Sequence, residues 1–279
     1  MLIKLVGIEI IKIFGKIRSL LGFLALAVLM PLIIWGFSKG ATGIEQDLVR
    51  QLEGSFIIVG SVFNGFLVTY ITMNFLWVHI PFLIMLVAGD VVAGEGASGT
   101  FRIILTRRIS RIKVLIAKLI ATYFYTIIFI TFFVLMSLGL GSLWLGVGDL
   151  VVFDKGILIL AQEMVWGRFA LAFLFATYVM IVVATLCFMF SSMVNNGIGP
   201  IIGAMSIIII GLAIANIPID IFENISPYIF TSYFDIWQKA FFDPIPWKDI
   251  GTDAIVLTSY TLVFIVISIV QFIRKDIST

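Results

Sequence analysis

Long apolar runs separated by short polar segments dominate this chain. Six of the runs approach the ~20 residues that an α-helix needs to cross a bilayer, whereas the strands of a membrane barrel would be shorter and alternating. The pattern therefore predicts an all-α membrane protein, with six transmembrane helices in one domain over residues 1–279. The predicted spans are about 19–37, 70–89, 114–140, 169–190, 198–215 and 252–272.

The second apolar run is longer than one span. Over residues 55–88 it has no acidic or basic side chain other than His79. As a single helix it would measure ~50 Å, against a hydrocarbon core of ~30 Å. Counting ~20 residues back from Asp90 gives the span stated above, so residues 56–69 lie on the outer surface, re-enter the membrane or extend the helix. Pro81 is expected to kink this span.

Residues 1–18 predict an amphipathic helix on the membrane surface. One arc of a helical wheel is wholly apolar and holds Leu2, Ile3, Val6, Ile10, Ile13, Phe14 and Ile17. The rest of the wheel carries all five charged side chains, Glu9 among them, so its basic side is expected to face the cytoplasm. A plain extension of the first span is the alternative.

Residues 89–118 form the most basic segment and lie between two predicted spans. They hold six of the eighteen Lys and Arg residues, namely Arg102, Arg107, Arg108, Arg111, Lys113 and Lys118. The positive-inside rule places this segment and both termini in the cytoplasm. An amphipathic helix is expected from Gly99 to about Arg108. Gly94 to Gly99 spell GxGxxG, but a span precedes them where the dinucleotide fingerprint needs a βαβ unit.

The sequence lacks the residues that several kinds of chemistry require. A single cysteine and a single histidine exclude a disulfide framework or a Cys/His metal cluster within the chain. No GxxxxGK[ST] phosphate loop occurs, so this chain does not hydrolyse ATP by that route, and we expect it not to be an enzyme. No predicted span carries the paired carboxylates of a proton relay.

A few polar side chains in or near the second span are candidates to line a translocation path. They are Asn64, Thr72, Asn74 and His79. The alternative for the Asn and Thr residues is that they hold helices together by hydrogen bonds. For His79 we favour a neutral imidazole that is hydrogen-bonded across a helix interface beside Trp77.

The basic segment resembles the signature E-x3-G-T…L-L…P-x-S-R…K of type-2 ABC transporter permeases. The matching positions are Glu95, Gly99, Thr100, Leu105, Ser110, Arg111 and Lys118. The resemblance covers nearly the whole chain, because the amphipathic N-terminus, the six spans and a large outer segment before the last span agree with it. One departure is Arg108-Ile109, where the family often has a proline before the Ser-Arg pair.

The resemblance implies half of an exporter in the cytoplasmic membrane. Two permease copies would form the path as a homodimer, above two copies of a separate ATPase that carries the ATP and Mg²⁺. Residues 96–108 would be the coupling helix that receives the ATPase movement, and residues 1–18 the connecting helix. The coupling residues would be Glu95, Gly99, Thr100, Arg102, Arg107, Arg108 and Arg111. No metal, no cofactor and no nucleic acid would bind this chain, and an extracytoplasmic accessory protein is a further candidate partner.

Two other functions compete with this one. A membrane anchor or sensor that recruits an extracytoplasmic partner would use the bulky outer segments, such as residues 216–250, and would move nothing. A secondary carrier is disfavoured by the lack of charge within the spans and of internal repeats. Trp237 and Trp247, in the last outer segment, are interpreted as anchors at the membrane interface.

Overall fold

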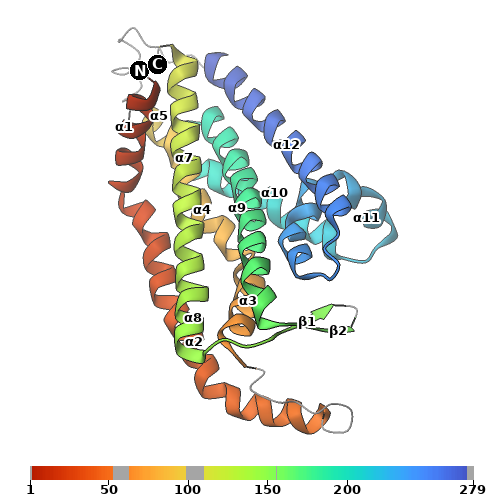
Figure 1. Ribbon diagram of the computed structural model, residues 1–279. Coiled ribbons are helices and arrows are strands. Elements are labelled where there is room, and N and C mark those ends of the chain that lie inside the picture. Colours follow the sequence, from red (N-terminus) through yellow and green to blue (C-terminus); the bar gives the residue numbers. More distant parts are fainter. Residues whose placement is uncertain (1, 53–62, 99–109, 155, 275–279) are drawn as a thin grey trace.

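The computed structural model describes residues 2–52, 63–98, 110–154 and 156–274. Within these residues, six helices are long and apolar enough to cross a membrane, as the hydrophobic pattern predicted. They extend over Ile17–Gly40, His79–Ala97, Arg111–Leu145, Gln162–Met193, Gly199–Asn216 and Trp247–Arg274. The start of the first helix and the end of the last lie at the same end of the bundle, which is called the terminal end below (Figure 1).

Helix α1 (Leu2–Phe14) stands alongside the first half of α7 (Arg111–Val134), and α2 (Ile17–Leu52) continues from it down the bundle (Figure 1). A helix in this region was predicted, but one of its charged side chains is placed differently. Glu9, assigned to the water-facing arc, is buried at 6% exposure. The wheel was misleading because it could not show that α7 presents a charged group to α1.

The second span is broken. Helix α3 (Gly65–Leu76) ends at Leu76 with Trp77 as its C-cap, and α4 begins at His79 (His79–Ala88). Pro81 explains the break, because it has no N–H for the carbonyl of Trp77 and its ring crowds that carbonyl. The candidate span is His79–Ala97 rather than the predicted 70–89. The count from Asp90 was wrong because α5 (Asp90–Ala97) continues past this carboxylate, which ion pairs neutralise.

Helix α7 continues through a π-helical turn, η1 (Leu135–Gly139), into α8 (Leu140–Leu145). This long helix crosses α3 at very short range. A Cβ added to Gly65 would lie 2.3 Å from the carbonyl carbon of Gly141, so the two backbones touch there and only glycine fits.

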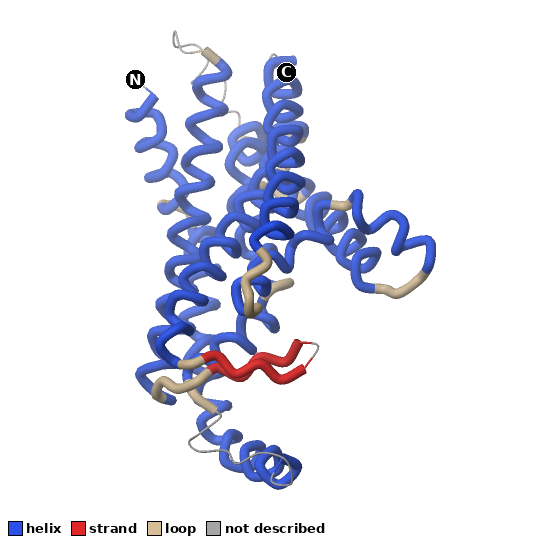
Figure 2. The backbone as a smooth tube through the Cα atoms, turned by 45° about the vertical axis from the view of Figure 1, so that its right-hand side comes forward, coloured by secondary structure: helices blue, strands red, loops and turns tan. Residues whose placement is uncertain are grey.

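A β-hairpin follows α8 and was not predicted within the outer loop 141–168. Strand β1 (Leu150–Asp154) pairs antiparallel with β2 (Gly156–Leu160), and Val152 lies opposite Leu158. The hairpin projects sideways from the bundle at the end opposite the termini (Figure 2). Its inner side chains are buried, whereas Ile157 and Ile159 are exposed.

Helix α9 (Gln162–Met193) is the centre of the bundle. In its most apolar stretch, 72% of the residues are buried, against 22% in the corresponding stretches of α2 and of α12 (Trp247–Arg274). It packs against α4, α7, α10 (Gly199–Asn216) and α12. The sequence of α9 is apolar on every side, which is typical of a helix surrounded by protein.

The segment before α12 folds back against the bundle. It forms α11 (Asp220–Ile225) and two 3₁₀ helices, η2 (Ser226–Tyr228) and η3 (Phe230–Phe241). Trp237 is fully buried and its ring centroid lies 5.4 Å from that of Trp77, so its interpretation as an interface anchor was wrong. Trp247, by contrast, is 60% exposed.

Two ion pairs attach η3 to the bundle. Arg168 of α9 donates to the carbonyls of Ala240 and Phe242 and lies 3.1 Å from the carboxylate of Asp243. Lys239 pairs with Asp253 of α12.

Candidate functional site

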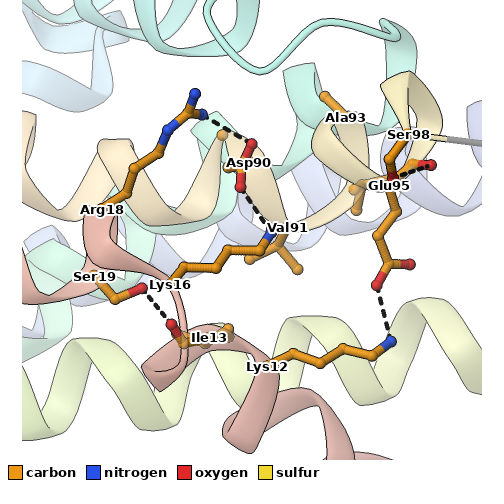
Figure 3. Close-up of polar contacts among 12 residues, drawn as sticks. Lys12, Ile13, Lys16, Arg18, Ser19, Asp90, Val91, Ala93, Glu95 and Ser98 are labelled. Carbon is orange, nitrogen blue, oxygen red and sulfur yellow. Dashed lines mark hydrogen bonds and ion pairs between the residues drawn. The ribbon is translucent and has the colours of Figure 1, made fainter. Parts of the chain in front are cut away.

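Charged side chains from three helices meet at the terminal end of the bundle. Helix α1 supplies Glu9 and Lys12, α5 supplies Glu95, and α7 supplies Lys118. These four residues form a closed ring, in which each carboxylate uses one oxygen for each lysine. Figure 3 shows Lys12 reaching from α1 toward Glu95 of α5. We call this group the ion-pair ring.

Lys118 is the innermost member of the ring, with no exposed surface. Its ammonium lies 2.7 Å from Oε2 of Glu9 and 2.8 Å from Oε2 of Glu95, and it donates to the carbonyl of Val91 at 3.1 Å. The contacts with Glu9 and Val91 are hydrogen bonds, whereas the contact with Glu95 is an ion pair. Because a buried charge is tolerated only when it is paired and hydrogen-bonded, Lys118 requires both α1 and α5 in these positions.

Lys12 closes the ring on its solvent side. Its ammonium lies 2.9 Å from Oε1 of both Glu9 and Glu95, and its side chain is 38% exposed. Partial burial by itself would lower the pKa of Lys12, but the two carboxylates outweigh burial and raise this pKa above its usual value of 10.5. Lys12 therefore remains charged at neutral pH.

Asp90 forms a second group beside the ring. Its carboxylate lies 2.7 Å from Nζ of Lys16 and 3.0 Å from Nη1 of Arg18 (Figure 3). Two glycines make room for this carboxylate, because a Cβ on Gly94 or Gly197 would lie 2.4 Å or 2.7 Å from Oδ1 of Asp90. The junction of α1 and α2 is therefore held to the start of α5.

The charged groups leave almost no space between them. A cavity of only about 10 Å³ lies between the ring and Asp90, near the smallest volume that holds one water molecule. This arrangement connects helices and does not offer a ligand pocket.

Ser191 of α9 contacts the junction of α4 and α5. Its hydroxyl donates to the carbonyl of Gly89 at 2.6 Å and accepts from the amide of Ala93 at 2.9 Å. In a regular helix, the amide of Ala93 would bond directly to that carbonyl. The hydroxyl is thus inserted into the helical ladder, which explains why α4 and α5 are separated at Gly89. Such an insertion is a known cause of a helix bend.

The ring brings together only part of the predicted coupling set. Glu95 is a ring member, and Arg111 begins α7 and donates to the carbonyl of Ile273 at 3.3 Å, near the end of α12. Gly99, Thr100, Arg102, Arg107 and Arg108, together with the predicted helix from Gly99 to Arg108, lie outside the described residues.

The predicted path residues divide into buried and exposed ones. Asn64 is buried, accepts from the amides of Phe66 and Leu67, and donates to the carbonyl of Asp149. It therefore caps α3 and fixes the hairpin. Thr72 is also buried, and its hydroxyl donates to the carbonyl of Val68 at 2.7 Å.

Asn74 and His79 lie on the surface around the break in the second span. Asn74 accepts a hydrogen bond of 3.0 Å from Gln238 of η3. The imidazole of His79 lies 3.2 Å from the carbonyl of Phe75 and stacks on the Phe75 ring. This partner is on the preceding turn of the chain, and the expected bond across a helix interface is not found among the residues that the structure describes.

Four residues of these contacts are not among the predicted site residues, namely Glu9, Lys12, Ser191 and Gln238. A signal for the first two existed, because an acid and a base three positions apart on a helix can pair with each other, and the acid can also pair with a lysine buried in a neighbouring span. Ser191 and Gln238 gave no such signal, since isolated hydroxyl and amide groups occur throughout the chain.

Comparison with protein families identifies the chain as a member of a family of unknown function. The family model, described as a protein of unknown function (DUF2705), matches residues 24–278, and the chain belongs to this family. Comparison with curated proteins found no match.

Proposed function

We propose that this chain is the permease subunit of an ATP-driven type-2 ABC exporter, which works as a homodimer above two copies of a separate ATPase. The ion-pair ring is the observation that carries the proposal. Helix α5 ends at Ala97 and α7 begins at Arg111, so these two helices lie on either side of the basic part of the signature, residues 98–110, which is called the signature segment below. The ring joins both helices to α1. A partner that displaces residues 99–108 would therefore move α1, α5 and α7 together.

This transmission needs rigid contacts rather than flexible ones. Lys118 has two carboxylate partners within 2.8 Å, and Ser191 fixes the junction of α4 and α5 from the central helix α9. Switching proteins commonly convert a local push into a rigid-body shift of packed elements. A net-neutral ring whose inner members are buried meets that requirement.

The surface around the helix break supports the dimer. Asn74, His79 and Gln238 are polar or amphipathic side chains within an apolar part of the bundle, and Asn74 and His79 are exposed. Polar groups at membrane depth rarely face lipid, because they need a hydrogen-bonding neighbour. Asn74 and His79 each have a partner within the chain, and a second copy or a water-filled path between two copies would cover the part of them that stays exposed.

Charge reversal in the signature segment tests the proposal. The triple variant Arg102→Glu, Arg107→Glu and Arg108→Glu reverses three positive charges of the segment that is proposed to meet the ATPase. We expect ATP hydrolysis by the purified complex to fall about tenfold or more, because the ATPase is lost or no longer responds to the permease. Unchanged hydrolysis by a folded complex would contradict the role of this segment.

A matched control reverses three exposed charges near the same end of the bundle. Lys4→Glu, Lys113→Glu and Arg274→Glu alter side chains that are exposed and belong to neither charged group described above. This variant carries the same change in net charge. Hydrolysis close to the wild-type rate is expected.

An anchor that recruits an extracytoplasmic partner is the second candidate. The observation in its favour is the exposed apolar surface opposite the terminal end, where Ile157 and Ile159 of the hairpin lie and where Leu143 is 84% exposed. Such surfaces often mark contacts with other proteins. A stoichiometric companion that is lost in the variant Ile157→Ser, Ile159→Ser, without any ATPase, would favour this function.

A further inference from the structure

An apolar groove of about 390 Å³ lies between α2 and α3, away from the ion-pair ring. Helix α2 contributes one face and α3 the other. The lining residues are Ile33, Gly36, Phe37 and Gly40 of α2, with Ile71, Thr72 and Phe75 of α3. The volume is within the range of about 300–1,000 Å³ that is typical of small-molecule sites.

The lining offers an occupant nothing but apolar surface. None of its residues is charged, and Thr72 is the one polar side chain among them. The Thr72 hydroxyl already donates to the carbonyl of Val68 at 2.7 Å. The chemistry of the groove therefore matches an unbranched aliphatic chain rather than a molecule with polar groups along its length.

Glycine keeps the α2 wall open. A Cβ added to Gly36 would meet no atom within 4 Å, so the space beside this residue is free. Leu29 lies seven residues before Gly36 on the same helical face, and it is 42% exposed. A helix laid along α2 would meet this side chain before it reached Gly36, whereas a chain one methylene wide can enter.

A basic residue, Lys39, directly precedes the lining residue Gly40 in the sequence and is exposed. Helix α2 continues past both residues to Leu52. Trp35, which is 54% exposed, lies one turn earlier, where aromatic side chains mark the level of lipid headgroups. A flexible lysine at this depth can extend its ammonium to a lipid phosphate.

We propose that this groove binds one acyl chain of an anionic phospholipid, whose phosphate pairs with Lys39. Lipid tails gain little by exchanging lipid for protein. The specificity therefore comes from filling a space that the side chains of α2 and α3 leave open, together with the charge of Lys39. This site does not depend on the chain being a transporter subunit.

Photocrosslinking in lipid nanodiscs tests the site. The probe is a phosphatidylglycerol with a diazirine on one acyl chain, and peptide mass spectrometry locates the adducts. In the wild-type chain we expect adducts concentrated on Ile33–Gly40 and Ile71–Phe75. Gly36→Leu fills the groove and should reduce these adducts to the level of other exposed apolar surfaces.

Gly251→Leu is the matched control. Gly251 lies in α12, and a Cβ there also meets no atom within 4 Å, but the residue is remote from the groove. Labelling of the groove should persist in this variant. Lys39→Gln should weaken labelling by phosphatidylglycerol but not by an uncharged diacylglycerol with the same diazirine chain.

Three results would overturn the proposal. Adducts spread evenly over exposed apolar positions, unchanged by Gly36→Leu, would show that no site exists. A groove that is labelled only after two copies are separated would show that a second copy occupies it. Equal labelling by both probes with no effect of Lys39→Gln would refute the phosphate contact.

Discussion

Nζ of Lys118 donates a hydrogen bond of 2.7 Å to Oε2 of Glu9, although the two residues are 109 positions apart in the sequence. This contact joins the N-terminal helix to the third span. Together with Glu95 and Lys12, it fixes three helices around one buried ammonium. If the chain is a permease, the contact is where movement of the signature segment enters the bundle.

Replacement of Lys118 tests how much the ring stabilises the fold. Lys118→Met leaves two buried carboxylates with one partly exposed lysine between them. Breaking a buried ion pair from one side typically costs about 3–5 kcal/mol, because an uncompensated charge stays buried. We expect a loss of that size in the free energy of unfolding, measured by SDS titration in mixed micelles.

Two further variants complete this test. Lys113→Met removes an exposed lysine of the same helix and should cost well under 1 kcal/mol. The double variant Glu9→Gln, Lys118→Met leaves Lys12 and Glu95 as a neutral pair and should recover part of the loss. Equal stability of Lys118→Met and Lys113→Met would show that the ring does not hold the helices.

The Ser191 hydroxyl is expected to bend the helix at the junction of α4 and α5. In Ser191→Ala, the amide of Ala93 can bond directly to the carbonyl of Gly89, so the helix straightens and Glu95 moves away from Lys118. The cost should be about 1–3 kcal/mol. Spin labels on α5 and α7 should report a changed distance in the same variant.

Ser268→Ala is the control for this change. Ser268 is also buried, but its hydroxyl donates to the carbonyl of Phe264 within its own helix. We expect little effect on stability and none on the distance between α5 and α7. If the two variants behave alike, the inserted hydroxyl has no special role.

The exposed polar surface at the helix break is expected to be in contact with water. Cys187 is the one cysteine of the chain and is buried, so Cys187→Ala provides a cysteine-free background. Cysteine at Asn74 or His79 should then react with a charged, membrane-impermeant thiol reagent. Cysteine at Ile120, an exposed apolar position on α7, should react far more slowly if it faces lipid.

Slow reaction at all three positions would contradict a hydrated path at the break. Fast reaction at Asn74 and His79 in single copies, with protection when two copies associate, would instead place this surface within the dimer contact. The rates of thiol labelling in single copies and in associated copies can both be measured without knowing the substrate.

Arg168 is expected to contribute more to stability than its partner Asp243. Arg168 is buried and holds two backbone carbonyls as well as the carboxylate, whereas the Asp243 side chain is 52% exposed. Arg168→Met should therefore cost about 2–4 kcal/mol, and Asp243→Asn about 1 kcal/mol or less. Thermal unfolding in detergent measures both, and the reverse order would show that η3 does not depend on these carbonyl contacts.

The span pattern could be predicted because a bilayer imposes it directly on composition. Runs of about 20 apolar residues suffice to locate spanning helices. A kink in the second span was predicted from Pro81. The break occurs near Trp77 because the carbonyl that loses its hydrogen bond is the one four residues before the proline. The hairpin was missed because a short apolar run in a loop has no length or periodicity that separates strand from helix.

The charged groups were harder to predict because they depend on tertiary contacts. A helical wheel of α1 places Glu9 on the solvent-facing side. Glu9 is buried instead because Lys118 of another helix lies beside it and pairs with it. The count from Asp90 assumed that an unpaired carboxylate ends a span, whereas Lys16 and Arg18 neutralise it. In both cases the sequence shows the charges but not their partners.

The most direct test of the permease proposal is the composition of the complex in native membranes. The tagged chain would be purified in a gentle detergent, and every co-purifying protein would be sequenced. The account predicts a stoichiometric subunit that carries a GxxxxGK[ST] phosphate loop, and two copies of this chain per complex. Repeated recovery of the intact chain without such a subunit would contradict it.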